Sequence, residues 1–535
     1  MDTWYTKRQY TRDQFDLAKV VLEEVRSGIN LEDAVRNNPL PEGGYLGKSL
    51  LVAAYKALVE DGEILEDSRI LAKIRLKPVR TLSGVTTVSV LTKPYPCPGK
   101  CIFCPTDVRM PKSYLPDEPG AMRALQHEFD PFNQVSARIK ALDDVGHPTD
   151  KVELLILGGT WSSYQRDYQE YFVKRCFDAL NQFDSNNLAQ AQNCNEIAKH
   201  RNVGLVVETR PDKINIDELI WLRKLGVTKL QMGAQSFDDR ILKINARGHT
   251  AKKTLDAVNL LRAMGFKIVL HWMPNLLGAN LDSDREDFTR MWQGYCPDEL
   301  KIYPTQLLKN ADLYHYWLNG DYQPYKTWEL IDLIADVKET IPRYCRVNRV
   351  VRDIPSTNVV KGNKRTSLRQ DVQRKLASRN KKCNCIRCRE VRAEVIDIDT
   401  LQLDDYVYEA ATFEEHFLSY NTPDDKIAGL LRLTLPGEKS PHTGLRDLTK
   451  AAIIREIHVY GQSLSVGTDQ ESAVQHSGLG TRLLEEAELI SREKGFMKIA
   501  VISAIGTRRY YLSRGFRRGD LYMVKELVKK QRYHP

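Results

Sequence analysis

The feature that most constrains the fold is an alternation of two sequence patterns between about residues 70 and 355. Short runs rich in β-branched residues alternate with longer stretches whose apolar residues recur at helical spacing. This alternation is typical of strand–helix units that build a parallel sheet. About six such units predict an open or partial β/α barrel, with its active site at the carboxyl ends of the strands. The expected strands are residues 88–92, 152–157, 203–208, 229–233, 267–272, 300–303 and 347–351.

Three cysteines, Cys97, Cys101 and Cys104, follow the first predicted strand with the spacing C-x3-C-x2-C. Iron–sulfur clusters normally take four protein thiolates, and this trio has no fourth cysteine near it in the sequence. The trio therefore favours a four-iron cluster whose last iron binds a small molecule, typically S-adenosylmethionine (SAM), which indicates radical chemistry. The alternative is a zinc knuckle completed by a distant residue, and the strand–helix pattern that follows the trio weakens it.

Polar residues and glycines follow several predicted strands at the point where each strand ends. A single polar strand end is an ordinary turn, but several that converge on one barrel mouth indicate a binding site. The double glycine Gly158-Gly159 lets the backbone approach a ligand closely. Glu208 and Arg210 are candidates for binding the ribose and the charged end of SAM, and Gln235 stands at the end of the next strand.

Length and composition predict a multidomain protein of a reducing compartment. A chain of 535 residues exceeds one core, so about three domains are expected. We expect no membrane partner, because no apolar run approaches the roughly 20 residues of a membrane span, and the N-terminus lacks the apolar core of a signal peptide. The ten cysteines form two trios and four single residues, an arrangement unlike a disulfide framework, which favours the cytoplasm.

Positive charge is concentrated in residues 343–392, which carry sixteen Lys or Arg residues against three acidic ones. The net charge of the whole chain is only +9, so we expect the positive field to belong to this linker-like segment. A charge run is usually a solvated face, but an excess this large between two candidate active domains favours RNA binding. The candidate RNA contacts are Lys361, Lys364, Arg365 and Arg369.

A second cysteine trio, Cys383, Cys385 and Cys388, lies inside this basic segment with the spacing C-x-C-x2-C. The trio supplies three zinc ligands, whereas a structural zinc site needs four. We expect a structural zinc ion that orders a segment whose charges would otherwise leave it flexible. The candidates that remain open for the fourth ligand are His271, His315, Cys296 and Cys345.

The two ends of the chain differ from the barrel. Apolar residues at helical spacing predict a small helical module before about residue 70. Near the other end, strand patterns at 428–435 and 453–460 precede a Q-x-x-G-x-G turn that begins at Gln475 and opens a helix. Consecutive backbone amides at such a helix start suit a pyrophosphate group. A further strand at 498–503 follows the helix.

The order of these C-terminal elements, with Tyr510 and Tyr511 after the last strand, resembles the acetyl-CoA-binding core of the GNAT acetyltransferases. In that family a tyrosine at one of these two positions lies near the thioester. Either tyrosine alone would more simply be explained by core packing. The expected organisation is an α/β multidomain chain with a helical module at 1–70, a partial radical SAM barrel at 71–342, a basic zinc-binding linker at 343–392 and a GNAT domain at 393–535.

A radical SAM barrel, a zinc-binding basic linker and a GNAT domain in one chain resemble the catalytic subunit of the Elongator complex along the full length. The first trio's spacing and the complete second trio are similar to bacterial and archaeal members, so accessory Elongator subunits are not expected as partners. The runs that carry the resemblance are IRLKPVRT at 74–81, EPGAMR at 118–123, DPF at 130–132, GHPTDKVE at 146–153, ETRPD at 208–212, RGHT at 247–250, REIHVYG at 455–461 and IAVIS at 499–503.

The resemblance implies a tRNA uridine(34) acetyltransferase that makes 5-carboxymethyluridine at the wobble position from acetyl-CoA. It implies that a SAM-derived radical takes hydrogen from the acetyl methyl group, whose carbon then adds to uridine C5 before the thioester is hydrolysed. The anticodon loop is single-stranded, which makes extrusion of the wobble base inexpensive. Two alternatives stay open: a protein lysine acetyltransferase with a scaffold barrel, and a non-catalytic tRNA-binding regulatory protein.

Matching family positions imply roles for individual residues. Lys151 matches a position linked to acetyl-CoA, although it lies in the barrel and read alone would be an ordinary solvated lysine, so its role requires the two domains to face one another. The residues implied in catalysis are Lys151, His458, Tyr510 and Tyr511. Those implied in acetyl-CoA binding are Lys151, Glu456, Ile457, His458, Val459, Gln475, Gly478, Leu479, Gly480, Thr481, Arg482 and Tyr511.

Overall fold

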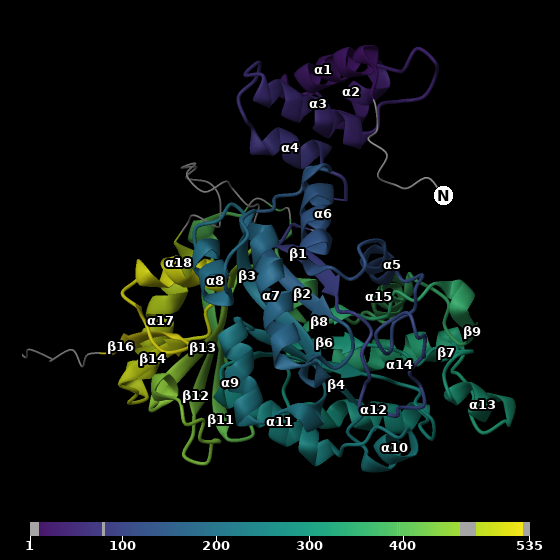
Figure 1. The fold of residues 1–535 in the computed structure, drawn as a ribbon, viewed down its shortest axis with the longest axis vertical. Coiled ribbons are helices and arrows are strands. Elements are labelled where there is room, and N and C mark those ends of the chain that lie inside the picture. The colour runs from purple at the N-terminus through teal and green to yellow at the C-terminus, as the bar shows by residue number, and fades with distance from the viewer. Residues whose placement is uncertain (1–9, 78–80, 393, 395, 461–477, 528–535) are drawn as a thin grey trace, which may run out of the picture.

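The molecule has a small helical body at one end, a half-barrel at its centre and a second sheet beside the half-barrel (Figure 1). Each of the two large sheets has seven strands. The chain is therefore α/β overall, and the parallel half-barrel confirms the prediction made from the strand–helix alternation. The computed structural model describes residues 10–77, 81–392, 394, 396–460 and 478–527.

Four helices build the N-terminal body, and a hydrophobic cluster of their own holds them together. They are α1 (Arg12–Arg26), α2 (Leu31–Asn37), α3 (Lys48–Glu60) and α4 (Ser68–Ile74). Thr11 begins α1 with a capping box, in which its hydroxyl accepts from the Gln14 backbone N–H and the Gln14 side chain accepts from the Thr11 N–H. An ion pair of 2.5 Å between Lys56 and Asp143 attaches this body to α6 (Pro131–Asp143) of the barrel.

Seven parallel strands form the half-barrel sheet. In spatial order they are β1 (Thr86–Leu91), β2 (Lys151–Leu157), β3 (Arg201–Thr209), β4 (Lys229–Gln235), β5 (Lys267–Trp272), β6 (Glu299–Ile302) and β8 (Arg346–Arg349). In β2, Val152, Leu154 and Ile156 are buried in the core, while the residues between them line the interior of the half-barrel. The outer face of β2 is therefore apolar, while its inner face carries the charged Lys151 and Glu153 as well as two leucines.

Helices cover the outer face of this sheet and occupy the long connections. Besides α6, they are α5 (Pro119–Gln126), α7 (Arg166–Asn181), α8 (Leu188–Asn195), α9 (Ile216–Leu225), α10 (Asp239–Ile244), α11 (Ala251–Ala263), α12 (Leu281–Arg290), α13 (Leu313–Leu318) and α14 (Thr327–Glu339). Parallel neighbours need such crossovers, because a tight hairpin joins only antiparallel strands. The connections leave the carboxyl ends of all seven strands at one mouth of the half-barrel.

The basic segment at 343–392 is folded, although its composition alone would leave it flexible. It contains β8, β9 (Val359–Lys361), α15 (Leu368–Ser378) and α16 (Ile386–Arg389). Strand β9 pairs with β7 (Leu307–Leu308). One face of α15 buries Leu368, Val372 and Leu376 in the core. This apolar stripe stabilises the helix despite the surrounding positive charge.

The C-terminal sheet is mixed: β13 and β14 pair in parallel and the other neighbours pair antiparallel. Its strands, in spatial order, are β10 (Gln402–Ala410), β11 (Phe413–Asn421), β12 (Ile427–Pro436), β13 (Ala451–Val459), β14 (Lys498–Val501), β16 (Met523–Glu526) and β15 (Arg517–Arg518). The helices are α17 (Leu479–Glu493) and α18 (Arg508–Leu512). Strands β12, β13 and β14 overlap the strand patterns read from the sequence.

Buried ion pairs fix the C-terminal sheet to the half-barrel. Arg455 of β13 donates to Asp298, just before β6, at 2.8 Å and to Glu415 of β11 at 2.5 Å, and all three side chains are almost fully buried. Beside them, the short helix η7 (Ile505–Thr507) packs on the start of β3, so closely that a methyl group on Gly506 would overlap the Asn202 backbone. The two parts therefore meet at the amino ends of the barrel strands.

Candidate active site

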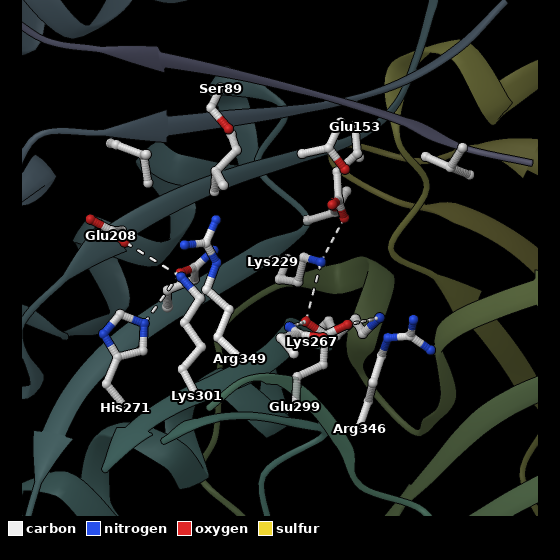
Figure 2. Close-up of a pocket in the computed structure, with 18 of the residues that line it drawn as sticks. Ser89, Glu153, Glu208, Lys229, Lys267, His271, Glu299, Lys301, Arg346 and Arg349 are labelled. Carbon is white, nitrogen blue, oxygen red and sulfur yellow. Dashed lines mark hydrogen bonds and ion pairs between the residues drawn. The ribbon is translucent and has the colours of Figure 1, made fainter. Parts of the chain in front are cut away.

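A cavity of about 1420 Å³ extends from the carboxyl ends of the barrel strands to the C-terminal sheet. Cys97, Cys101 and Cys104 line it near the strand ends, and Gly480 and Tyr510 line it at the C-terminal sheet. Figure 2 shows charged residues that line it between the strands. Two groups of predicted site residues, which lie more than 350 positions apart in the sequence, therefore share one continuous space.

The lining of this cavity is strongly basic, with eighteen Lys or Arg residues against seven Asp or Glu residues. Only six of the eighteen belong to the segment 343–392. The prediction that the positive field belongs to that segment alone is therefore wrong, because the barrel strands also direct basic side chains inward. A polyanion such as RNA would find positive charge along the whole cavity.

A chain of alternating charges crosses the middle of the half-barrel (Figure 2). Lys229 pairs with Glu153 at 2.6 Å and with Glu299 at 3.3 Å, and Lys267 pairs with Glu299 and with Glu456, each at 2.5 Å. Burial would raise the pKa of Glu299, but the two lysines outweigh burial and hold that pKa well below its ordinary value. Closed barrels usually fill this space with branched apolar residues, so the charges indicate a functional interior.

The environment of Cys101 favours a thiolate. Its Sγ accepts from Arg247 Nη1 at 3.4 Å and from Arg210 Nη1 at 3.8 Å. Its pKa is lowered to about 5, first by a hydrogen bond with Cys104 and then by these guanidinium groups. Because iron–sulfur clusters bind cysteine as thiolate, this donor set fits the cluster predicted from the spacing of the trio.

Two backbone positions keep this end of the cavity open. A methyl group on Gly99 would collide with the Arg210 guanidinium, and one on Gly158, whose φ is +139°, would collide with the Thr92 hydroxyl. Gly158 thus serves packing against β1 as well as backbone access. Gly159 lines the cavity itself.

The residues expected to bind SAM lie at this end of the cavity with different partners. Glu208 accepts from the Tyr114 hydroxyl at 2.8 Å. Arg210 is held by Asp212 at 2.9 Å and faces the cysteine loop, where it donates to Cys101. Gln235 lines the cavity, and its buried Oε1 accepts no hydrogen bond from the described residues. An acceptor left in this state fits a ligand that supplies an N–H or O–H donor.

At the other end of the cavity, no described side chain caps the start of α17. Gly478 precedes the helix with a φ of +74°. Thr481 accepts from Arg514 Nε at 3.1 Å, and the Arg514 guanidinium lies 3.6 Å from the Tyr510 ring centre. Gly480, Thr481 and Tyr510 all line the cavity. The N–H groups at this helix start suit an anion.

Some of the other residues implied in acetyl-CoA binding line the cavity, and others do not. Ile457, Val459 and Tyr511 line the cavity, as do Glu456 and His458. Two do not line it: Leu479 belongs to the hydrophobic core, and Arg482 packs over the Tyr420 ring at 4.7 Å. Gln475 lies outside the described residues. The implied pyrophosphate turn therefore reaches the cavity through Gly478, Gly480 and Thr481.

Burial shifts the pKa values of Lys151, His458 and Tyr511. Burial lowers the pKa of Lys151 from its ordinary value, and Arg201 adds to this effect. Burial lowers the pKa of His458 to about 4, and its Nε2 lies 3.2 Å from the Ser83 carbonyl oxygen. Burial also raises the pKa of Tyr511, which keeps its hydroxyl protonated. Lys151 and Tyr511 line the same cavity, so the two domains do face one another there.

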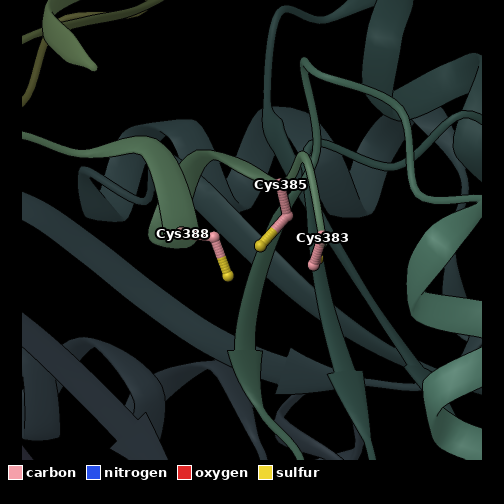
Figure 3. Close-up of side chains that lie close together, drawn as sticks. All are labelled: Cys383, Cys385 and Cys388. Carbon is pink, nitrogen blue, oxygen red and sulfur yellow. The ribbon is translucent and has the colours of Figure 1, made fainter. Parts of the chain in front are cut away.

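The second cysteine trio forms a compact group (Figure 3). Among the residues that the structure describes, only Cys383, Cys385 and Cys388 place three potential ligand atoms within 4.8 Å of one another. A single zinc ion needs such closeness, because its sulfur ligands stand about 2.3 Å from it. The Sγ atoms of the first trio, Cys97, Cys101 and Cys104, do not all lie within 4.8 Å of one another. That difference fits a four-iron cluster, in which each thiolate binds a different iron.

None of the four candidates for the fourth zinc ligand joins this trio. His271 Nε2 lies 3.2 Å from Gln231 Oε1 inside the barrel, and Cys296 donates to the Trp292 carbonyl oxygen at 3.5 Å. His315 is exposed on α13. Cys345 is buried, and its carbonyl oxygen accepts from the Ile386 N–H, so its backbone is the nearest of the four to the trio.

Three of the four residues predicted to contact RNA are exposed. They are Lys361, Lys364 and Arg365. Arg369 is half-buried instead, donates to the carbonyl oxygens of Val347 and Asn348, and lines the cavity. It therefore supports the backbone next to β8 as well as adding positive charge to the cavity. Among the described residues, none of the helices has the length and apolar character needed to cross a membrane.

Comparison with known proteins shows what this chain is similar to. Residues 95–291 match the radical SAM superfamily, and residues 297–378 match the Radical_SAM C-terminal domain. The chain is 42% identical to a tRNA uridine(34) acetyltransferase of Dehalococcoides mccartyi over 456 residues, which cover 84% of this chain and 99% of the relative. It is 37% identical to human Elongator complex protein 3, over 86% of this chain and 87% of that protein.

A solved structure gives the same result. The archaeal Elp3 of Methanocaldococcus infernus, with residues 1–46 deleted, matches with a TM-score of 0.72 and 36% identity. The match covers 83% of this chain and 99% of that one. The chain therefore belongs to the radical SAM superfamily and, within it, to the family that comprises the tRNA uridine(34) acetyltransferases and Elongator complex protein 3.

Proposed function

We propose that this protein is a tRNA uridine(34) acetyltransferase that uses acetyl-CoA to form 5-carboxymethyluridine at the wobble position. The observation that carries this proposal is the single basic cavity, which reaches both the Cys97, Cys101 and Cys104 loop and the uncapped start of α17. Relatives with this name, about 40% identical over most of the chain, support it. The basic lining suits the phosphates of an anticodon loop.

In this proposal the first cysteine trio holds a four-iron cluster, and the strand ends at Gly159, Glu208 and Gln235 hold SAM. When bound, these groups supply a carbon radical strong enough to activate a methyl C–H bond. The protein's part is positioning and charge. Arg247 and Arg210 keep Cys101 as a thiolate, and Gln235 offers its free acceptor to orient the ligand.

The C-terminal sheet with α17 and α18 acts in this proposal as a GNAT-type domain. The amides of Gly480 and Thr481, with the positive end of the α17 dipole, bind the pyrophosphate of acetyl-CoA. Tyr511 keeps its proton and donates a hydrogen bond toward the acyl group. His458 is neutral near pH 7 because burial lowers its pKa to about 4. Lys151 approaches the same group from the barrel side.

The proposal also includes a structural zinc ion and the tRNA anticodon loop. Cys383, Cys385 and Cys388 bind a structural zinc ion that fixes α16 beside the cavity. The tRNA anticodon loop enters the basic cavity, helped by the exposed lysines and arginine between 361 and 365. One continuous cavity reaches both proposed sites within one chain, which supports a reaction without accessory Elongator subunits.

The test is anaerobic reconstitution of the iron–sulfur cluster, followed by incubation with SAM, a reductant, acetyl-CoA and tRNA, and mass spectrometry of the nucleosides. Wild type should form 5-carboxymethyluridine, whereas neither Cys101→Ser nor Tyr511→Phe should form it. The matched control is Cys194→Ser, a cysteine that does not line the cavity. Equal acetylation of a protein substrate by wild type and Cys101→Ser, without any tRNA product, would contradict the proposal.

A further inference from the structure

Arg247, in the loop after α10, is a buried arginine whose guanidinium group contacts a cysteine of the first trio. The residue is 5% exposed, and its Nη1 donates to Cys101 Sγ at 3.4 Å. Within the described part of the chain, no carboxylate forms an ion pair with Arg247, and its Nε has no hydrogen-bond partner. Arginine keeps its charge in proteins, and a buried charge needs a compensating partner. The position of Arg247 therefore points to an anionic sulfur atom.

The surrounding backbone holds this guanidinium group in place. Arg247 Nη2 donates to the Gly233 carbonyl oxygen at 2.6 Å. A methyl group on Gly233 would stand only 2.8 Å from the same nitrogen, so the glycine at the end of β4 leaves the space that the guanidinium fills. Cys101 is 6% exposed and belongs to a hydrophobic cluster. Solvent therefore screens the contact between Arg247 and Cys101 only weakly.

The hydrogen bonds to Cys97 are of a different kind. Cys97 Sγ accepts from the Gly99 backbone N–H at 3.4 Å and lies 3.5 Å from the Thr160 hydroxyl oxygen. Both of these groups are uncharged, whereas Cys101 accepts from the guanidinium of Arg247. Charge-assisted hydrogen bonds are roughly twice as strong as neutral ones. The contact at Cys101 is therefore stronger than those at Cys97.

Arg210 also donates to Cys101, but an adjacent carboxylate opposes its charge. Its Nη1 lies 3.8 Å from Cys101 Sγ, farther than Nη1 of Arg247. Its Nε pairs with Asp212 at 2.9 Å. Its Nη2 donates to the Arg247 carbonyl oxygen at 2.8 Å, so Arg210 also fixes the backbone that carries Arg247. Arg247 is therefore the main source of net positive charge at this sulfur atom.

We propose that Arg247 raises the reduction potential of the iron–sulfur cluster held by Cys97, Cys101 and Cys104, through its charge-assisted hydrogen bond to Cys101 Sγ. Reduction transfers one electron to the cluster from a one-electron donor and takes up no proton, so the site becomes more negative by one charge. A fixed positive charge beside one sulfur atom stabilises the reduced form more than the oxidised form. Net charge and hydrogen bonds to the sulfur atoms are among the factors that set such potentials.

This role makes Arg247 a positioning residue, because it acts through a cluster ligand and not on a substrate. The inference rests on the iron–sulfur cluster of the proposed function. A residue that only supported the loop would change how much cluster the protein holds, but would leave the potential of the bound cluster unchanged. The potential therefore separates the proposed role from a merely structural one.

The test compares the full chains of wild type, Arg247→Met and Arg247→Lys after anaerobic reconstitution. Iron and sulfide analysis counts the clusters, and electron paramagnetic resonance follows their reduction by dithionite at a series of solution potentials, without SAM. In Arg247→Met the ratio of reduced to oxidised cluster at a fixed potential should fall about tenfold, which is about 59 mV for one electron. Arg247→Lys keeps the charge and should stay closer to wild type.

The matched control is Arg240→Met on the neighbouring helix α10. Arg240 is exposed and donates to the Gly278 carbonyl oxygen at 3.1 Å, so this variant should keep the wild-type potential. Arg247→Gln, also neutral, replaces Arg247→Met if the latter does not take up the cluster. Equal potentials in wild type and the neutral variant would overturn the role of Arg247 alone. Wild type that binds no four-iron cluster would overturn the proposed function and this inference with it.

Discussion

Glu456 and His458 occupy neighbouring inward positions on β13, but their surroundings give them different states. Burial would raise the pKa of Glu456, yet Lys267 and Arg432 outweigh burial and lower it to about 2. Burial lowers the pKa of His458 to about 4, so this imidazole is neutral near pH 7. Glu456 is therefore an ionised anchor between the two domains. His458 is left to form neutral hydrogen bonds in the cavity.

Asp284 of α12 offers a test of burial at the residue scale. Burial raises its pKa to about 7, whereas an unfolded aspartate titrates near 3.9. The folded state thus favours the protonated carboxyl. The contribution of Asp284 to stability is fully present below about pH 4 and is lost as pH rises to about 7, at about 1.4 kcal/mol per pH unit.

In wild type the Asn275 backbone N–H donates to the Asp284 carboxylate at 2.8 Å. Asp284→Asn cannot ionise, and its amide oxygen can still accept this hydrogen bond. Its free energy of unfolding should therefore fall less between pH 5 and pH 7 than that of wild type. Urea unfolding at a series of pH values measures this. The control is Asp282→Asn, whose side chain is 97% exposed on the same helix. Identical slopes in wild type and Asp284→Asn would contradict the burial argument.

The barrel elements could be predicted from sequence because their apolar patterns are strong and local. Strand β5, for example, lies at Lys267–Trp272, where the sequence pattern predicted it. The hairpin of β10 and β11 was missed, because β10 alternates exposed and half-buried residues and carries Asp404 and Asp405. Such a strand is stabilised by its pairing with β11 rather than by an apolar pattern of its own.

The candidate site was predictable only in part. Cysteine spacing and the glycine turn identified both ends of the cavity, because metal ligation and a helix start impose local sequence patterns. The charged middle, with Lys229, Glu299 and Lys301, was not predicted. Its residues come from separate strands, and only the register between strands turns them toward one space.

At the scale of elements, we expect the position of helix η7 to control acetyl-CoA binding. A methyl group on Gly506 would overlap the backbone of Asn202, which cannot move without displacing β3. Gly506→Ala should push α18 away from Lys151 and strongly reduce acetyl-CoA binding, while SAM cleavage at the far end of the cavity continues. Isothermal titration with acetyl-CoA and an assay for 5′-deoxyadenosine measure the two effects.

The matched control for Gly506→Ala is Gly429→Ala in β12, where a methyl group would stand 3.5 Å from Val459 Cγ2, an ordinary contact. That variant should retain acetyl-CoA binding. If Gly506→Ala binds acetyl-CoA as wild type does, η7 does not set the position of the acetyl site.

We expect the exposed cations of the basic segment to bind tRNA phosphates. Replacing Lys361, Lys364 and Arg365 together by Ala should weaken tRNA binding and flatten its dependence on salt, by about one unit of slope for each phosphate that the variant no longer neutralises. Binding measured at several salt concentrations tests this. A triple replacement of Arg12, Arg36 and Arg69 on the N-terminal body removes the same charge elsewhere as a control. An unchanged slope in the first variant would exclude these residues from the RNA-binding surface.

At the scale of the whole molecule, the two sites stand at opposite ends of the barrel strands. Lys151 begins β2, and Gly158 follows its last residue. Seven residues at about 3.3 Å each give a separation of about 23 Å along the strand. The buried ion pairs hold this separation, because they fix the C-terminal sheet to the amino ends of the strands. In the proposed reaction, the substrates must therefore span the basic interior between the acetyl-CoA site and the cysteine loop.

Arg455 is the centre of that junction. Arg455→Met would remove the shortest ion pairs of Asp298 and Glu415 and leave these buried carboxylates only longer pairs, with Arg432 at 3.5 Å and Arg262 at 3.3 Å. Breaking a buried pair typically costs about 3–5 kcal/mol. Urea unfolding should show this loss. Arg446→Met removes an exposed pair with Asp520 and should cost less than about 1 kcal/mol. Equal stabilities of the two variants would mean that the buried pairs do not secure the junction.

The most direct test of the central claim follows the acetyl carbons through the cavity. Acetyl-CoA labelled with ¹³C at both acetyl carbons is supplied to the reconstituted protein with SAM, reductant and tRNA, and the wobble nucleoside is analysed by mass spectrometry. If both sites serve one reaction, wild type yields 5-carboxymethyluridine carrying both labelled carbons, and neither Cys101→Ser nor Tyr511→Phe yields any. Labelled product from Cys101→Ser, or unlabelled product from wild type, would contradict the account.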